Sequence, residues 1–183
     1  PMTPSEPTAQ HTARSPRRVR GVDLTPNVLV VAAGVIWFVV GQSWLTQSRL
    51  AALLDDGQVE QAATLAREHL EDPASAELCL LIVRALRMAD SLAESDQALD
   101  TYESLIDSPE RVGQERSLNR ARRGQLDGVD VRLPAFLRDP ELDERDVCEA
   151  FAIGLRLNRR FDEAAQLLEA WQRDWPNDYR PHY

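Results

Sequence analysis

Arginines gather within one short stretch of an otherwise acidic chain of 183 residues. Arg116, Arg120 and Arg123 stand four and three residues apart, so they share one face if this stretch is helical. A basic face in an acidic body makes these three arginines the candidate partner-binding residues. The alternative is a solvated face, in which they form ion pairs with nearby carboxylates, those of Glu115, Asp127 or Asp130.

Motifs for catalysis are absent from the sequence. It contains no Gly-rich phosphate loop, no HExxH, no paired Cys motif and no G-x-S-x-G. The three histidines, His11, His69 and His182, are too scattered to indicate a site. We therefore expect a protein that is not an enzyme, without catalytic, metal or cofactor-binding residues, and we find no sign of a small-molecule substrate.

The acidic run 138–146 and the two cysteines have simpler explanations than metal binding. The run lacks the alternating Asp/Asn ladder, the central Gly and the terminal Glu of a calcium loop. Acidic residues are favoured at a helix N-terminus, which is where we place it. Cys79 and Cys148 fall in apolar helical contexts and are expected to pack in the core; a disulfide or metal site is the alternative.

The net charge of −9 is unevenly distributed. Residues 1–26 carry +2, residues 27–48 carry no charge, and residues 49–183 hold the remaining −11. A body this acidic repels a phosphate backbone, so we expect no nucleic-acid partner.

The uncharged stretch 25–48 is long enough to cross a bilayer as a helix. Thr25 and Pro26 supply an N-cap and a proline for the first turn, and residues 27–46 would form the span, with Trp44 as an interfacial aromatic. We interpret the stretch as an uncleaved signal anchor. A cleaved signal peptide and a buried core helix are the alternatives.

Arginine asymmetry predicts the orientation of this segment. Four arginines precede it, whereas Arg49 stands nearly alone after it and is followed by acidic residues. The N-terminus should therefore be cytoplasmic and the acidic body extracytoplasmic, or periplasmic in a bacterium. Residues 1–24 are rich in Pro, Ser, Thr and Arg, and we expect a disordered cytoplasmic tail.

Two sets of markers indicate a repeat after the apolar segment. Pro73, Pro109, Pro140 and Pro176 each follow or occupy a helix-start signal, at spacings of 36, 31 and 36. A second set consists of the small or short apolar residues that close the blocks GQVEQA, SDQA, GQLDGV and RRFDEA: Ala62, Ala98, Val129 and Ala164. Each unit reads as two short amphipathic helices joined by a tight turn.

This pattern resembles the tetratricopeptide repeat, most closely in the fourth unit. Ala152 stands at the family's small position in the first helix, and Phe161, Ala164 and Pro176 stand at its aromatic, small and closing Pro positions. Trp171 departs from the family's preferred Ala, and the third unit is short, with Pro134 inside its second helix. The resemblance implies a groove lined by first-helix residues that binds extended peptides, sometimes gripping carboxylates with basic side chains.

These observations predict an all-α chain with three parts: a tail over 1–24, a transmembrane helix over 25–48, and an α-solenoid of repeat hairpins over 49–183. Because Pro176 opens a further helix pair, we expect the repeats to continue beyond this chain. The first functional hypothesis is a membrane-tethered scaffold that binds other proteins or peptides through its groove. The alternative is a docking arm of a larger enzyme or of a secretion or transport component.

Overall fold

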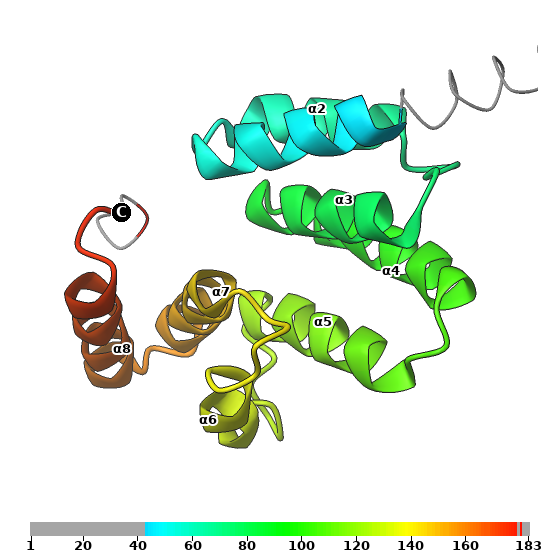
Figure 1. Cartoon of the computed structure of the whole chain (residues 1–183). Helices are drawn as coiled ribbons and strands as arrows, with labels where there is room; N and C mark the ends of the chain where they lie inside the picture. The colour runs from blue at the N-terminus through cyan, green and yellow to red at the C-terminus, as the bar shows by residue number, and fades with distance from the viewer. Residues whose placement is uncertain (1–42, 179, 181–183) are drawn as a thin grey trace, which may run out of the picture. The chain divides into compact units, whose positions relative to one another are not determined.

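The computed structural model describes residues 43–178 and 180, and this part of the chain is helical, without strands. The predicted all-α class is confirmed. A first helix, described over residues 43–55, is followed by α2 (Val59–Glu68), α3 (Ala76–Met88), α4 (Leu92–Leu105), α5 (Pro109–Arg122), the 3₁₀ turn η1 (Asp130–Arg132), α6 (Leu133–Phe136), α7 (Glu144–Leu157) and α8 (Phe161–Asp174). All described residues belong to one compact unit, in which successive helices pack side by side (Figure 1).

Four chain reversals share one backbone geometry. Their central residues, Gly57, Asp90, Gly124 and Arg159, have φ between 58° and 78° and lie 33 to 35 residues apart. In each turn, the residue that follows the central one donates its backbone amide to the carbonyl of the residue five positions before it, at 2.8–2.9 Å. These bonds run from Gln58 to Leu53, Ser91 to Leu86, Gln125 to Arg120, and Arg160 to Leu155. This pairing satisfies carbonyls that a helix end otherwise leaves open. The repeat expected from the sequence is therefore present as a recurring helix-ending turn.

The turns correct the expected register in the second unit. Ala62, Val129 and Ala164 each lie five residues after a turn, but the residue at this position after Asp90 is Ser95, three residues before the expected Ala98. Ser95 is fully buried and its hydroxyl donates to the Val83 carbonyl at 3.1 Å. A serine can replace alanine here because the neighbouring helix supplies an acceptor for its hydroxyl.

Of the four marker prolines, only Pro109 begins a helix as expected: Pro73 and Pro140 lie three and four residues before α3 and α7 begin, and Pro176 lies in a turn. Side-chain caps mark the starts of α3 and α7 instead. Pro109 lies in the first turn of α5, where its missing N–H costs nothing. The Ser75 hydroxyl caps α3 by accepting from the Leu78 amide at 3.1 Å, and Asp143 caps α7 by accepting from the Arg145 amide at 3.0 Å. The acidic run before α7 is thus a helix N-terminus, as predicted.

The third helix pair lacks a full second helix. Residues 130–136 form only η1 and the four-residue α6, and Pro134 lies in the first turn of α6 instead of inside a longer helix. Because no long helix intervenes, α7 packs directly against α5. Gly154 is the point of closest approach, since a Cβ built there would overlap the backbone carbonyl of Ala121.

The core has two hydrophobic clusters. One joins the first helix to α5 and includes Leu50, Ile82 and Leu99; the other is built around Phe151, whose ring meets Phe136 edge-on with centroids 6.2 Å apart. In the fourth unit the expected apolar positions are mostly buried, but Leu157 and Phe161 are each 61% exposed. They lie at the end of α7 and the start of α8, beside the turn, where the neighbouring helices do not cover them.

The expected membrane segment lies largely outside the described residues. Of the range 25–48, only 43–48 are described, and they belong to the first helix. Within the described part of the chain, no helix is long and apolar enough to cross a membrane. Trp44 and Leu45, at the beginning of that part, are 64% and 60% exposed.

Candidate functional site

Buried ion pairs connect the first helices of successive pairs. Arg87 on α3 donates to Glu115 on α5, Nη1 to Oε2, at 2.8 Å, and the side chains are only 3% and 2% exposed. The second oxygen of Glu115 lies 3.1 Å from Nη2 of Arg111, one turn earlier on α5. A buried charge needs a partner, so these groups depend on one another.

Asp146 on α7 lies at the centre of the network. Its Oδ2 accepts from Nε of Arg84 at 2.6 Å and lies 3.6 Å from Nη2 of Arg87. Its Oδ1 accepts from Nη1 of Arg180 at 3.2 Å. Arg84 also donates to Asp143 at 2.9 Å. Burial opposes the charged form of Arg84, but the charge and hydrogen bond of Asp146 outweigh it, so the pKa of Arg84 is raised.

Arg122, at the end of α5, forms a second junction. It donates to Glu149 on α7 at 2.6 Å and to the Met88 carbonyl at the end of α3 at 2.9 Å. Its Nε is buried without a hydrogen bond, and the carboxylate of Asp90 lies 3.5 Å from it. Arg122 therefore joins α3, α5 and α7 at one point.

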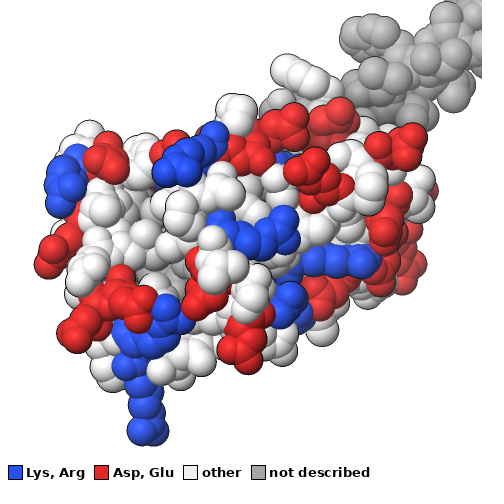
Figure 2. All heavy atoms as spheres, turned by 90° about the horizontal axis from the view of Figure 1, so that it is seen from below, with Lys and Arg blue, Asp and Glu red and all other residues white. Residues whose placement is uncertain are grey.

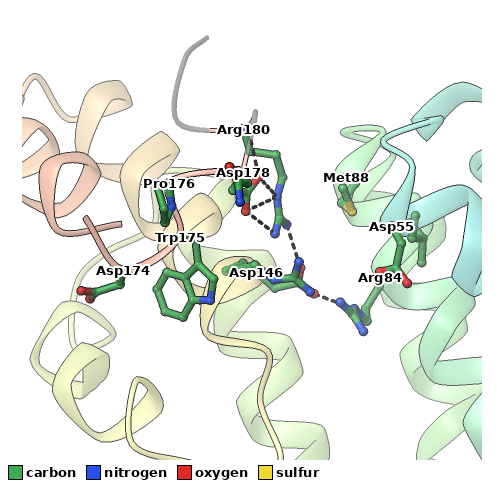
Figure 3. A pocket seen from close by; sticks show the side chains of 12 residues that line it. Asp55, Arg84, Met88, Asp146, Asp174, Trp175, Pro176, Asp178 and Arg180 are labelled. Atoms are coloured by element: carbon green, nitrogen blue, oxygen red, sulfur yellow. Dashed lines mark hydrogen bonds and ion pairs between the residues drawn. The ribbon is translucent and has the colours of Figure 1, made fainter. Parts of the chain in front are cut away.

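The segment after α8 turns back into this network (Figure 3). Arg180 reaches Asp146 and Glu149 with Nη1, at 3.2 and 3.4 Å, and its guanidinium carbon lies 5.2 Å from the ring centroid of Trp171. Asp178 accepts from Nη2 of Arg180 at 2.9 Å and from Nε1 of Trp171 at 3.1 Å. Burial alone would raise the pKa of Asp178, but the hydrogen bonds from Arg180 hold it below its ordinary value.

Arg180 and Met88 each line two cavities. The polar cavity, about 400 Å³, is bounded by Asp55, Arg84 and Asp146 together with the segment 174–178. The apolar cavity, about 360 Å³, lies between the first turn and helices α7 and α8; its lining includes Gly57, Val59, Ile153, Leu168 and Trp171. Together they form a groove that runs from the first hairpin to the last, and we call it the inner groove.

Arg156 is a cation of the inner groove without a partner in the described residues. It lines the apolar cavity from α7, is exposed, and makes no ion pair or side-chain hydrogen bond within residues 43–178 and 180. A charged group in this position is available to a ligand that fills the apolar cavity.

The three arginines proposed from the sequence lie elsewhere. Arg116 bonds to Asp100 and Glu103 on α4, at 2.7 and 2.9 Å. Arg123 bonds to the Leu92 carbonyl and Asp96, and Arg120 donates to the Asp127 carbonyl at 3.1 Å. All three bond to groups of this chain, but Arg116 and Arg123 reach carboxylates other than those expected for a solvated face, and Arg120 reaches a backbone carbonyl. They line neither cavity of the inner groove.

Sequence reasoning missed the groove residues because their signal is spread over several helices. On α7, Asp146, Glu149, Ile153 and Arg156 follow one another at steps of three, four and three. Glu77, Leu80, Arg84 and Arg87 repeat these steps on α3, although of these four only Arg84 lines the inner groove. A search for mixed polar residues at this spacing, in register with the turns, would have indicated the common face.

The cysteines behave as predicted. Cys79 and Cys148 are buried free thiols, and burial raises their pKa values to about 11 and about 12. Within the described ranges, no group of three or more His, Cys, Asp or Glu is arranged to hold a metal ion.

The outer surface of the described region carries both charges. Figure 2 shows basic side chains interspersed with acidic ones, and acidic side chains gathered along one edge of this face.

No family model matches the chain, and no curated protein or solved structure matches it either.

Proposed function

We propose that this protein is a membrane-tethered scaffold that binds extended segments of other proteins in its inner groove, outside the cytoplasm. The observation that carries the proposal is the groove itself. It combines an apolar cavity with a polar one along a single path, as recognition of a peptide with mixed side chains requires.

The recurring turn supports a tetratricopeptide-like solenoid as the framework. Stacked helical hairpins present their first helices on one concave side, and such surfaces serve as binding sites. Here, α3, α5 and α7 contribute the network of ion pairs beside the groove. The network links these helices to one another, and its members Arg122 and Glu149 also line the apolar cavity.

The membrane tether rests on the sequence. The uncharged stretch 25–48, the excess of arginine before it and the exposed Trp44 together favour an anchor with its N-terminus in the cytoplasm. If so, the protein stays at full length in the membrane pellet after an alkaline carbonate wash. Recovery of a soluble form that begins near Trp44 would contradict the anchor.

Topology is tested with the variant Ala165→Cys. Ala165 is exposed on α8, and the native thiols are buried, so the new cysteine is the one expected to react. We expect labelling by a membrane-impermeant thiol reagent in intact cells, or after the outer membrane is permeabilised. Labelling only after lysis would reverse the topology.

Site-specific cross-linking tests the groove. A photoreactive amino acid replaces Ile153, which lines the apolar cavity, and in a matched control it replaces Ala165, which lines neither cavity. After illumination of membranes we expect covalent adducts to other polypeptides from position 153 and not from position 165. Equal adducts at both positions, or none at position 153, would refute the proposal.

A further inference from the structure

The inner groove already holds a short piece of this chain. Asp178 and Arg180 enter it from the end of α8 and use separate parts of it. The Trp171 indole N–H donates to the carboxylate of Asp178, while the Trp171 ring, Asp146 and Glu149 receive the guanidinium of Arg180. The recognised elements are thus an acidic residue and an arginine two positions later.

The receiving groups are held in place without this segment. Asp146 accepts from Arg84 at 2.6 Å, and Glu149 accepts from Arg122 at 2.6 Å. Both bonds are shorter than those to Arg180, which measure 3.2 and 3.4 Å. The two carboxylates therefore keep their positions when Arg180 leaves, as a pre-organised site requires.

Arg180 uses little of its hydrogen-bonding capacity on the groove. Only Nη1 reaches Asp146 and Glu149, whereas Nε and Nη2 bond to Asp178, which belongs to the same short segment. A guanidinium offers five donors, and planar two-point pairing with a carboxylate is its strongest mode. A ligand arginine that pairs with both carboxylates can compete with this arrangement.

Space and charge favour a longer ligand of the same kind. Arg180 lines both cavities, of about 400 and 360 Å³, so room for a longer ligand remains next to the arginine. Residues 49–183 carry a net charge of −11, which attracts a basic partner.

We propose that the Trp171–Asp146–Glu149 site binds a partner segment containing an acidic residue and an arginine in the pattern Asp-x-Arg, in competition with the chain's own Asp178 and Arg180. The proposal rests on the peptide-binding function proposed above and names its ligand chemistry. The chain's own segment acts as an internal competitor that lowers the apparent affinity for the partner.

The size of the effect follows from the occupancy of the site. If the internal segment fills the site in about nine molecules of ten, the apparent affinity for a partner falls about tenfold. An open variant, Asp178→Asn with Arg180→Gln, removes the competitor. Arg173→Gln on α8 is a matched control, because Arg173 is exposed and lines neither cavity.

The binding experiment uses the full chain in detergent micelles and a fluorescent peptide with the sequence of residues 174–180, DWPNDYR, capped at both ends. Fluorescence anisotropy measures its dissociation constant. We expect the open variant to bind about tenfold tighter than the wild-type chain, and Arg173→Gln to match the wild-type chain. Replacing the peptide's arginine with glutamine, or adding Glu149→Gln to the open variant, should weaken binding about tenfold because a charged hydrogen bond is lost.

Equal affinity of the wild-type and open chains, or binding that ignores the peptide's arginine, would overturn the proposal. A dimer of the wild-type chain that disappears in the open variant, as measured by sedimentation, would also overturn it. In that case the site would bind the segment of a second copy of this chain. Circular dichroism verifies folding of the open variant. If it unfolds, Arg180→Lys serves instead: it keeps the charge, loses the planar fork, and should tighten peptide binding about threefold.

The cross-linking experiment separates this proposal from the broader function. Adducts from position 153 that persist while the arginine requirement fails would leave peptide binding intact and reject the Asp-x-Arg ligand. If instead no adducts form at position 153 but binding in micelles still requires the peptide's arginine, the scaffold function in the membrane is rejected and the Asp-x-Arg ligand is retained.

Discussion

Gly154→Ala tests the direct packing of α7 on α5 and has a matched control in the same protein. Both Gly154 and Gly113 lie within helices, and alanine favours a helix over glycine by about 1 kcal/mol. At Gly113 a new Cβ meets nothing within 4 Å, so Gly113→Ala should stabilise the fold by about 0.5–1 kcal/mol. At Gly154 the Cβ overlaps the Ala121 carbonyl and lies 3.0 Å from Leu126 Cδ2.

The overlap at Gly154 involves backbone and cannot be relieved by a rotamer change. Overpacking costs about 1–3 kcal/mol and here also forces the two helices apart, so the net effect should be a loss of about 1–2 kcal/mol. Urea denaturation of the full chain in detergent, followed by helical circular dichroism, should show a midpoint lowered by about 0.5–1 M, for a slope near 2 kcal/mol per M. Stabilisation by both substitutions alike would refute the close approach of α5 and α7.

Three further predictions use the same denaturation assay. Ala164→Leu should lower the free energy of unfolding by about 1–3 kcal/mol because Ala164 is buried against the neighbouring helix. Ala165→Leu should lower it by under about 0.5 kcal/mol because Ala165 is exposed. Equal losses would show that the repeat register is wrong. Glu115→Leu should lower the free energy of unfolding by about 3–5 kcal/mol, because Arg87 stays buried without its main partner. Combining it with Arg87→Met should recover only part of that loss, because Arg111 has also lost its carboxylate partner. The pKa of Asp178 is lowered because its hydrogen bonds with Arg180 outweigh its burial, so the ionised carboxylate stabilises the fold. This stabilisation should be complete above about pH 5 and should be lost as pH falls below 3.8. Asp178→Asn should make the free energy of unfolding less dependent on pH in this range, and an unchanged slope would contradict the prediction.

Local signals in the sequence were sufficient for the helices, but the marker prolines gave only one helix start correctly, that of α5 at Pro109. Pro109 and the caps Ser75 and Asp143 act within one turn of the chain, so their effects do not depend on distant residues. A repeat was also visible, but in the second unit the sequence indicated Ala98 where the structure has Ser95. Its role depends on a carbonyl of the preceding helix, at Val83, and no local pattern reveals that partner.

The candidate site shows the limit of such reasoning most clearly. Arg116, Arg120 and Arg123 form an evident basic stripe, yet they face α4 and the loop after α5. Periodicity identifies residues that share a face but does not say which neighbour that face meets. The charge cluster therefore did not indicate the inner groove, and partner binding by these three arginines stays a prediction.

By itself, the sequence determined the all-α class, the presence of a repeat of roughly 35 residues and the burial of both thiols, because these depend on residue type and short-range geometry. Only the tertiary structure decided that Arg84, Arg122 and Arg180, each from a different helix pair or segment, converge on the carboxylates of α7. These partners lie 27 to 62 residues apart in the chain. They come together only after the turns have set the angles between helices and the absence of a side chain at Gly154 has allowed α7 to pack against α5. Ion pairs form between groups that packing has already brought within a few ångströms, so their partners follow from the packed fold.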